Sequence, residues 1–229
     1  MLTKAQIKRL KSLSEKKYRD EYGEFLVEGE KMVAEALASG FEVLEVIRED
    51  QETMSRISSL STAPPVAAVV RKPAPKALSL DRGLYLGLDS VRDPGNMGTL
   101  LRLADWFGIK TVFASQDCVE VFNPKTIQAS MGSIFRVGAV YCDLEDICQR
   151  FRALDMPVYG TFMNGEDIYS QNLANEGLVI LGNESNGISP AVASRVSTRL
   201  TIPSFGGGAE SLNVATAAAV VLSEFRRRR

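Results

Sequence analysis

The sequence of 229 residues contains no histidine at all. This absence excludes Ser-His and Cys-His catalytic triads, histidine-ligated zinc and any imidazole general base. Any proton that the protein moves must therefore pass through another group. Cysteine is scarce, with only Cys118, Cys142 and Cys148. Their odd number and the lack of a CxxC pair argue against a metal site and more strongly against a disulfide framework, so we expect reduced, structural cysteines and no metal.

Long apolar runs and a large net charge are also missing. No uncharged stretch is long enough to cross a bilayer, and the N-terminus lacks the apolar core of a signal peptide, so we expect a cytoplasmic protein without a membrane contact. The net charge of −1 argues against indiscriminate binding of nucleic acid. The length allows one large domain, or a small one plus a medium one.

Positive charge gathers at both ends of the chain. Residues 1–19 hold seven basic side chains against the single acid Glu15, and the chain ends in Arg226–Arg229. Such arms can follow the phosphates of a nucleic acid, whereas the alternatives are a solvated helix face and a frayed tail. For the C-terminal arginines the question stays open. For the N-terminal arm we favour phosphate contact, through Lys4, Lys8, Arg9, Lys11, Lys16, Lys17 and Arg19.

A segment with two prolines and no periodicity divides the chain. We predict a linker at residues 73–82, between domains at residues 1–72 and 83–229. The first domain alternates helices and strands, which predicts a small three-layer α/β unit with strands at 24–28, 41–47 and 66–70. The second alternates more regularly and predicts a doubly wound parallel sheet. Its predicted strands are 84–88, 111–114, 135–141, 158–161, 178–181 and 199–202, and its last helix is 212–225.

Three segments of the second domain run from a buried-strand pattern through a turn towards a helix start: residues 84–107, 177–189 and 200–222. Turns of this kind place backbone N–H groups and short polar side chains at the carboxyl ends of parallel strands, where α/β proteins bind cofactors. Three such turns predict one pocket assembled from distant parts of the chain.

In order, these segments resemble the three motifs of the SpoU branch of the SPOUT methyltransferases. Asp93–Gly98 followed by Arg102 matches the first motif, Gly182–Ile188 the second, and Ile202-Pro203 with Ser211–Ala215 the third. The resemblance implies methylation of an RNA ribose 2′-hydroxyl, in rRNA or tRNA, with S-adenosylmethionine as cofactor. It also implies a SPOUT-type parallel sheet flanked by helices, a C-terminal trefoil knot, a homodimer and a ribosomal-protein-like RNA-binding domain at residues 1–72.

The resemblance further implies the site residues. The catalytic pocket would hold Asn96, Arg102, Glu184, Ser211 and Asn213, and the cofactor would lie against Leu181, Gly182, Asn183, Glu184, Ile202, Ser211 and Leu212. A guanidinium is protonated and only donates hydrogen bonds, so Arg102 is either a base helped by a substrate phosphate or a cation that positions the 2′-oxygen. Taken alone, the residues also allow a tight βα loop, a solvated Arg102 and Ser211 as the cap of the last helix.

Two other functions stay open at this point. One is a catalytically silent RNA-binding module that would tolerate loss of Arg102. The other is a Rossmann-type nucleotide-binding oxidoreductase, although the glycine spacing in residues 87–98 does not fit GxGxxG. We expect Met97, Trp106 and Met131 in the core, and we expect the Ala- and Val-rich face of residues 214–222 to pack between subunits.

Overall fold

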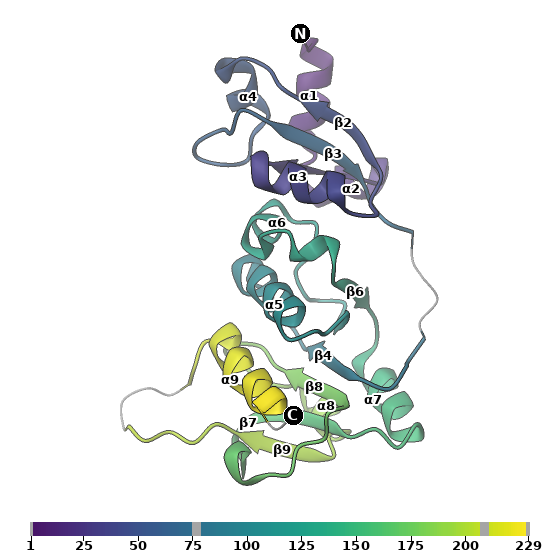
Figure 1. Ribbon diagram of the computed structural model, residues 1–229, viewed down its shortest axis with the longest axis vertical. Helices are drawn as coiled ribbons and strands as arrows, with labels where there is room; N and C mark the ends of the chain where they lie inside the picture. Colours follow the sequence, from purple (N-terminus) through teal and green to yellow (C-terminus); the bar gives the residue numbers. More distant parts are fainter. Residues whose placement is uncertain (1, 75–78, 207–210, 228–229) are drawn as a thin grey trace.

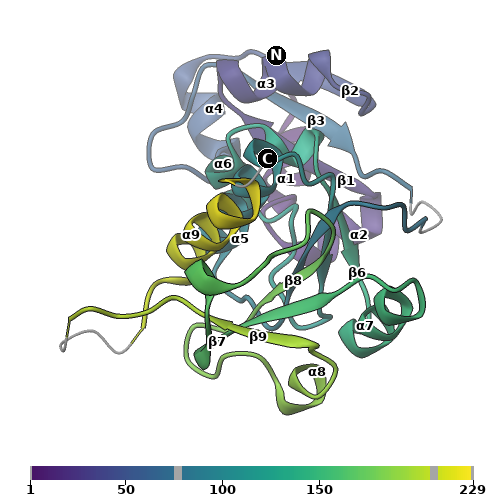
Figure 2. The same ribbon diagram turned by 60° about the horizontal axis from the view of Figure 1, so that its bottom comes forward.

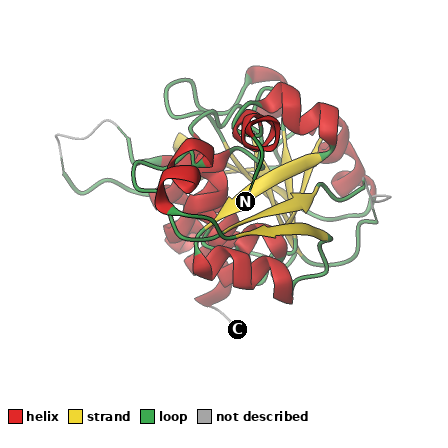
Figure 3. Cartoon of the chain, turned by 90° about the horizontal axis from the view of Figure 1, so that it is seen from above, coloured by secondary structure: helices red, strands yellow, loops and turns green. Residues whose placement is uncertain are grey.

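Two sheets organise the chain in a computed structural model, which describes residues 2–74, 79–206 and 211–227 (Figure 1). The first sheet has three antiparallel strands in the order β1-β3-β2. The second has six parallel strands in the order β6-β5-β4-β8-β7-β9. Helices pack on both sides of the strands (Figure 3). The predicted α/β fold with a parallel sheet flanked by helices is confirmed.

The N-terminal unit has the three layers that the sequence predicts. Its elements are α1 (Lys4–Ser12), α2 (Lys16–Tyr22), β1 (Glu24–Glu28), α3 (Glu30–Ala38), β2 (Val43–Ile47), α4 (Gln51–Ile57) and β3 (Ala67–Arg71). Leu26 packs with Leu10 of α1 and Met54 of α4 on one face of the sheet, and Phe25 packs with Val33 of α3 on the other. Helix α2, which the sequence did not predict, ends at Gly23 in the left-handed conformation (φ +66°).

The second unit carries the parallel sheet. Its elements are β4 (Leu84–Leu88), α5 (Pro94–Trp106), β5 (Thr111–Ala114), α6 (Pro124–Ser130), η1 (Ser133–Phe135), β6 (Gly138–Tyr141), α7 (Leu144–Ala153), β7 (Val158–Asp167), η2 (Ile168–Ser170), β8 (Gly177–Leu181), α8 (Pro190–Ala193), β9 (Thr198–Thr201) and α9 (Val214–Arg227). Helices α7 and α8 cover one face and α5, α6 and α9 the other (Figure 2). The predicted strand 135–141 begins three residues late, because the 3₁₀ turn η1 ends at Phe135.

Strand order brings the first two motifs together. β4 and β8 are hydrogen-bonded neighbours in parallel register, from Leu84 opposite Gly177 to Leu88 opposite Leu181. Both motif turns therefore leave the same edge of the sheet. Helix α9, which follows the third motif, packs against α5. Residues 207–210, between β9 and α9, lie outside the described residues, and the trefoil knot stays a prediction.

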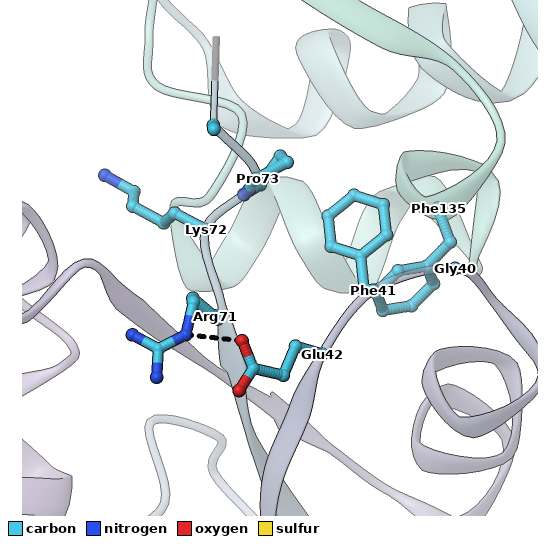
Figure 4. A pocket seen from close by; sticks show the side chains of 8 residues that line it. Gly40, Phe41, Glu42, Arg71, Lys72, Pro73 and Phe135 are labelled. Carbon is cyan, nitrogen blue, oxygen red and sulfur yellow. Dashed lines mark hydrogen bonds and ion pairs between the residues drawn. The ribbon is translucent and has the colours of Figure 1, made fainter.

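The two units share one apolar core. Phe25 of β1 lies 4.5 Å, between ring centroids, from Phe122 of the second unit, and Phe41 lies 5.2 Å from Phe135. A cavity of about 380 Å³ opens beside Phe41 and Phe135, where Arg71 pairs with Glu42 at 2.6 Å (Figure 4). The predicted linker is described at residues 73–74 and 79–82 only, and residues 75–78 lie outside the described part.

Candidate functional site

The turn of the first motif is the start of helix α5. Asp93 caps the helix, because its Oδ1 accepts a hydrogen bond from the Asn96 backbone N–H at 2.7 Å, and Pro94 occupies the first helical position. Helix α5 therefore begins at Pro94, within the first motif. The cap places Asn96 in the first turn, with its side chain at the carboxyl edge of the sheet.

Three predicted site residues, one from each motif, form a continuous chain of hydrogen bonds. Asn96 donates through Nδ2 to Glu184 Oε1 at 2.6 Å. Asn213 donates through its own Nδ2 to Asn96 Oδ1 at 3.0 Å. These contacts join positions 88 and 117 residues apart in sequence. The structure thus brings Asn96, Glu184 and Asn213 into one cluster.

Asn213 is also the cap of helix α9. Its Oδ1 accepts from the backbone N–H groups of Ala215 (3.0 Å) and Thr216 (3.3 Å), and the helix begins at Val214. The prediction that Ser211 caps this helix is wrong, and so is the helix start at residue 212, which would have placed Asn213 inside the helix. Ser211 is exposed, two residues before the cap.

The second motif is a tight turn closed on itself. Asn183 and Gly187 exchange both backbone hydrogen bonds at 2.9 Å, and Asn183 Oδ1 accepts from the N–H groups of Ser185 (3.0 Å) and Asn186 (3.1 Å). A Cβ at Gly182 would lie 2.1 Å from the carbonyl carbon of Gly187. Glycine at 182 is therefore needed for the return of this turn.

A buried carboxylate beneath the turns was not predicted. Asp89, at the end of β4, is only 4% exposed, and its Oδ2 accepts from the Ser189 N–H at 2.7 Å. Its own N–H donates to the carbonyl of Leu181 at 2.9 Å. The sequence signal for this residue was its position directly after the buried strand β4. A carboxylate buried there needs hydrogen-bond donors, and the backbone N–H of Ser189 supplies one.

Arg102 lies apart from the hydrogen-bonded cluster. It is exposed on α5, on the face that also carries Thr99 and Trp106. Within the described residues it makes no hydrogen bond or ion pair, so its donors face solvent. Trp106 is 83% exposed and Met131 40%, so the expectation of core positions is wrong for both, whereas Met97 is fully buried as predicted.

The predicted phosphate-binding arm contains exposed lysines and side chains held by a partner, and Lys11 is both, because its Nζ donates to the carbonyl oxygen of Ser58 at 2.5 Å. Arg19 is 2% exposed and paired with Glu120, so its assignment to RNA contact is wrong. Arg9 pairs with Glu24, and Lys16 pairs with Asp20 at 2.5 Å. Lys17 is exposed, with its Nζ 5.5 Å from the ring centroid of Tyr18. The α1 lysines are Lys4, Lys8 and Lys11, and all three are exposed. They line a cavity of about 550 Å³ together with Tyr18 and Arg56.

The first two of the C-terminal arginines belong to α9 and do not form a frayed tail. Arg226 donates from Nε to the carbonyl oxygen of Phe107 at 2.9 Å, and Arg227 pairs with Glu224 at 2.7 Å. Arg228 and Arg229 lie outside the described residues.

The cysteines fit their expected structural role. Burial raises the pKa of Cys142 to about 11 and that of Cys148 to about 12, and it also raises the pKa of Cys118, so these thiols stay protonated and unreactive at neutral pH. Among the described residues there is no group of three acidic or cysteine side chains arranged to hold a metal ion. In the same part of the chain, no helix has the length and apolarity needed to cross a membrane.

The residues that adjoin the cluster in sequence, or that follow β9, suit a cofactor with a flat aromatic base and a charged end. Leu212 is 50% exposed next to Asn213, Ile202 is half-buried after β9, and Leu181 ends β8. Leu212 and Ile202 offer apolar walls, while the Glu184 carboxylate offers the negative charge that suits a sulfonium or ammonium group. This composition fits S-adenosylmethionine.

Comparison with known proteins also indicates an RNA methyltransferase that uses S-adenosylmethionine. The family model described as the SpoU rRNA methylase family matches residues 83–223, and that described as the MRM3-like substrate binding domain matches residues 4–79. The 23S rRNA (guanosine(2553)-2′-O)-methyltransferase RlmP of Bacillus subtilis is 32% identical over 96% of both chains. A structure from Porphyromonas gingivalis, assigned to the TrmH family of RNA methyltransferases, aligns with a TM-score of 0.92 at 40% identity over 100% of both chains. AviRb of Streptomyces viridochromogenes with bound AdoMet aligns with a TM-score of 0.88 at 25% identity, covering 99% of this chain and 98% of AviRb.

Proposed function

The chain belongs to the SpoU rRNA methylase family, and from that premise we propose that it methylates a ribose 2′-hydroxyl of large-subunit ribosomal RNA. The methyl donor is S-adenosylmethionine. Two relatives that match 95% or more of the chain are named as 23S rRNA methyltransferases. One is named for a guanosine and the other for a uridine, so the proposal does not extend to the base. Neither the silent RNA-binding module nor the oxidoreductase finds support in these comparisons.

The observation that carries the proposal is the cluster of Asn96, Glu184 and Asn213. It joins all three motif turns at one edge of the sheet through hydrogen bonds of 2.6 and 3.0 Å. Bound there, S-adenosylmethionine would supply a methyl group on a sulfonium that needs no metal to activate it as a leaving group. The chain has to hold the acceptor ribose in line, and positioning alone lowers the barrier of such a displacement substantially.

We assign Arg102 to that positioning. An exposed guanidinium stays protonated at any ordinary pH, so it offers donors and a fixed positive charge and does not accept the 2′-hydroxyl proton unaided. It would hold the phosphate next to the target ribose by paired N–H donors and align the 2′-oxygen. Ser211 is kept in the proposed pocket as an exposed hydroxyl beside Asn213.

The cofactor would lie between the second and third motif turns. Leu181, Gly182, Asn183 and Glu184 form one wall of the proposed site, and Ile202, Ser211 and Leu212 form the other. Asn183 fixes the shape of the first wall. Its Oδ1 accepts from backbone N–H groups within the turn, and its Nδ2 donates to the carbonyl oxygen of Ser90 on the neighbouring β4–α5 segment.

We further propose that the enzyme is a homodimer that contacts through Trp106, at the C-terminal end of the exposed face of α5 and one turn beyond Arg102. Trp106 on that face is 83% exposed, and a large exposed aromatic side chain is typical of an interface anchor. Of the predicted α9 interface, Val214, Ala218 and Val221 are buried in the core of one chain, whereas Ala217, Ala219 and Val220 are half-buried and leave part of that face for a partner. Sedimentation should show a dimer for the wild type and a monomer for Trp106→Glu. A wild-type monomer would contradict the proposal.

The N-terminal unit is proposed to hold the RNA through the α1 lysines and Lys17. These side chains are exposed, and the charges of the α1 lysines lie along one cavity. A cytoplasmic location is part of the same proposal, because ribosomal RNA of bacteria is made and modified in the cytoplasm.

The test has two parts. Mass-spectrometric mapping should find one ribose methylation missing from the rRNA of a strain that lacks the protein, and the purified protein should restore it. Arg102→Ala should then lower turnover on that rRNA by about 10²-fold or more, as losses of catalytic groups do. Arg150→Ala, which removes an exposed arginine of α7 on the opposite face, is the control and should leave turnover unchanged. Equal rates for Arg102→Ala and the wild type would refute the assignment.

A further inference from the structure

One loop touches both the first motif's turn and the N-terminal unit. It is the β5–α6 loop, residues 115–123, which begins where β5 ends and leads into α6. Its first residues bind the turn between β4 and α5, and its last residues bind the N-terminal unit. The loop thus connects the turn of the first motif with the N-terminal unit. The proposed function requires these two parts to keep a fixed position relative to each other, because one transfers the methyl group and the other holds the RNA.

On the first side, the loop holds Ser90 in a strained conformation. Ser90 has φ +59°, in the left-handed region that residues with a side chain disfavour. Its N–H donates to Ser115 Oγ at 2.8 Å, and its hydroxyl donates to Asp117 Oδ2 at 2.6 Å. Ser115 Oγ in turn donates to Asp117 Oδ1 at 2.6 Å. Because both hydroxyls donate to it, the pKa of Asp117 falls to about 2, so the carboxylate is ionised at neutral pH.

Ser90 in this conformation also contacts the second motif. Its carbonyl oxygen accepts from Asn183 Nδ2 at 2.8 Å. Asn183 directly precedes Glu184, whose Oε1 accepts from Asn96 at 2.6 Å. Asp117 therefore acts on Glu184 through Ser90 and Asn183, without touching the site itself.

On the second side, the loop fixes the N-terminal unit by charge and by packing. Glu120 Oε2 accepts from Arg19 at 2.6 Å (Nη2) and 3.1 Å (Nε), and Glu120 Oε1 pairs with Lys72 Nζ at 2.7 Å. The remaining terminal nitrogen of Arg19, Nη1, donates to the carbonyl oxygens of Leu13 (2.9 Å) and Ser14 (2.8 Å), so all three guanidinium nitrogens have a partner. Breaking an ion pair this deeply buried leaves an uncompensated charge, which is strongly unfavourable.

The loop between the two carboxylates is held firmly. Val119 donates its N–H to the carbonyl of Val91 at 2.9 Å and accepts at its own carbonyl from the Tyr141 hydroxyl at 2.6 Å. The same hydroxyl accepts from the Val121 N–H at 2.9 Å. Only two residues, Cys118 and Val119, separate Asp117 from Glu120. These contacts hold the middle of the loop in place when the contact on one side is lost.

We propose that the β5–α6 loop is a positioning element that sets the N-terminal unit against the methyl-transfer site, with Asp117 and Glu120 as positioning residues on its two sides. The inference rests on the proposed function, because it requires RNA on the N-terminal unit. Loss of the Asp117 contact disturbs the Glu184 turn and lowers kcat. Loss of the Glu120 contact loosens the RNA-holding unit and raises KM for RNA.

The test uses the full chain and rRNA from a strain that lacks the protein. Asp117→Asn should lower kcat about 10-fold with KM for RNA changed less than about 2-fold, whereas Glu120→Gln should raise KM for RNA about 5-fold or more at an unchanged kcat. The affinity of Glu120→Gln for S-adenosylmethionine should equal that of the wild type. Since the two sides act on different steps, the double variant should show both effects combined.

Matched control variants distinguish a loss of positioning from a general loss of stability. Glu176→Gln removes the partner of Arg82 at the surface and should change neither parameter. Should Glu120→Gln fail to fold, Lys72→Met removes one of the two cations that pair with Glu120, together with the Lys72–Asp20 pair, and should raise KM for RNA by a smaller factor while Arg19 keeps its contact. An active wild type whose variants change the same parameter, or neither, overturns the inference alone. A wild type that methylates no rRNA overturns the proposed function and the inference with it.

Discussion

Asn213 has two structural roles that a pair of substitutions can separate. Its Oδ1 caps α9 by accepting from Ala215 and Thr216, and its Nδ2 donates to Asn96 Oδ1 at 3.0 Å. Asn213→Ala removes both roles. Asn213→Asp keeps the cap, because a carboxylate accepts the same N–H groups and is favoured at a helix N-terminus, but it removes the donor to Asn96.

The magnitudes follow from those contacts. Loss of an N-cap costs about 1 kcal/mol and loss of the hydrogen bond about 1 kcal/mol more, so Asn213→Ala should lower the free energy of unfolding by about 2 kcal/mol. Asn213→Asp should lower it by only about 1 kcal/mol, because the cap stays and only the second contact is lost. In that variant the Asn96 oxygen faces the new carboxylate. Rotating the Asn96 amide would only turn the same oxygen towards Glu184, so one oxygen–oxygen contact remains in either orientation.

The site should therefore be disturbed in both variants although only one is strongly destabilised. Urea unfolding gives the stability of each, and initial rates on rRNA from a strain lacking the protein give kcat/KM. We expect kcat/KM to fall about 10-fold or more in both. Asn213→Asp with wild-type kcat/KM would show that the link between Asn213 and Asn96 does not matter for the reaction. Equal destabilisation of the two variants would refute the capping role.

Three further outcomes are expected. Gly98→Ala should lower the free energy of unfolding by about 1–2 kcal/mol, because the added Cβ would lie 2.5 Å from the Thr126 carbonyl oxygen of α6. Gly83→Ala, whose Cβ would meet no atom within 4 Å, should not lower it in urea unfolding. The pKa of Asp117 is lowered in the folded state, so its stabilisation is complete above the unfolded pKa near 4 and is lost as the pH falls through about 2. The free energy of unfolding of the wild type should exceed that of Asp117→Asn by about 1 kcal/mol at pH 6, after allowance for solvent screening, and by progressively less as the pH falls to 2. A difference independent of pH would contradict this. Replacing the α1 lysines by alanine should flatten the salt dependence of RNA binding and leave cofactor affinity intact, which filter binding at several salt concentrations would check.

The sequence allowed the parallel sheet and the three motif turns to be predicted because those features are local. A buried-strand pattern followed by a turn and a helix start identifies the carboxyl edge of a strand without knowledge of its neighbours. The adjacency of β4 and β8, which brings Asn96 to Glu184, is a property of strand order and does not follow from periodicity. The resemblance to a known family supplied that grouping of residues.

The errors arose where a distant partner decides the role of a side chain. Ser211 and Asn213 are both good helix caps, and the choice of Asn213 goes with its contact to Asn96, 117 residues away. Arg19 belongs to a basic run in the sequence, yet Glu120, 101 residues later, holds it in a buried ion pair. Trp106 was expected in the core because of its size, but its position on the outer face of α5 leaves it exposed within one chain.

The direction of donation explains why amides occupy two of the three clustered positions. An amide donates at one end and accepts at the other, so Asn213 can cap α9 and still donate to Asn96, and Asn96 can accept from Asn213 and still donate to Glu184. A carboxylate only accepts, so Glu184 ends the chain of hydrogen bonds. Each step thereby fixes the rotation of the next side chain and ties the first turns of α5 and α9 to the turn after β8. The same contacts that stabilise the three motif turns therefore set the orientation of the Glu184 carboxylate.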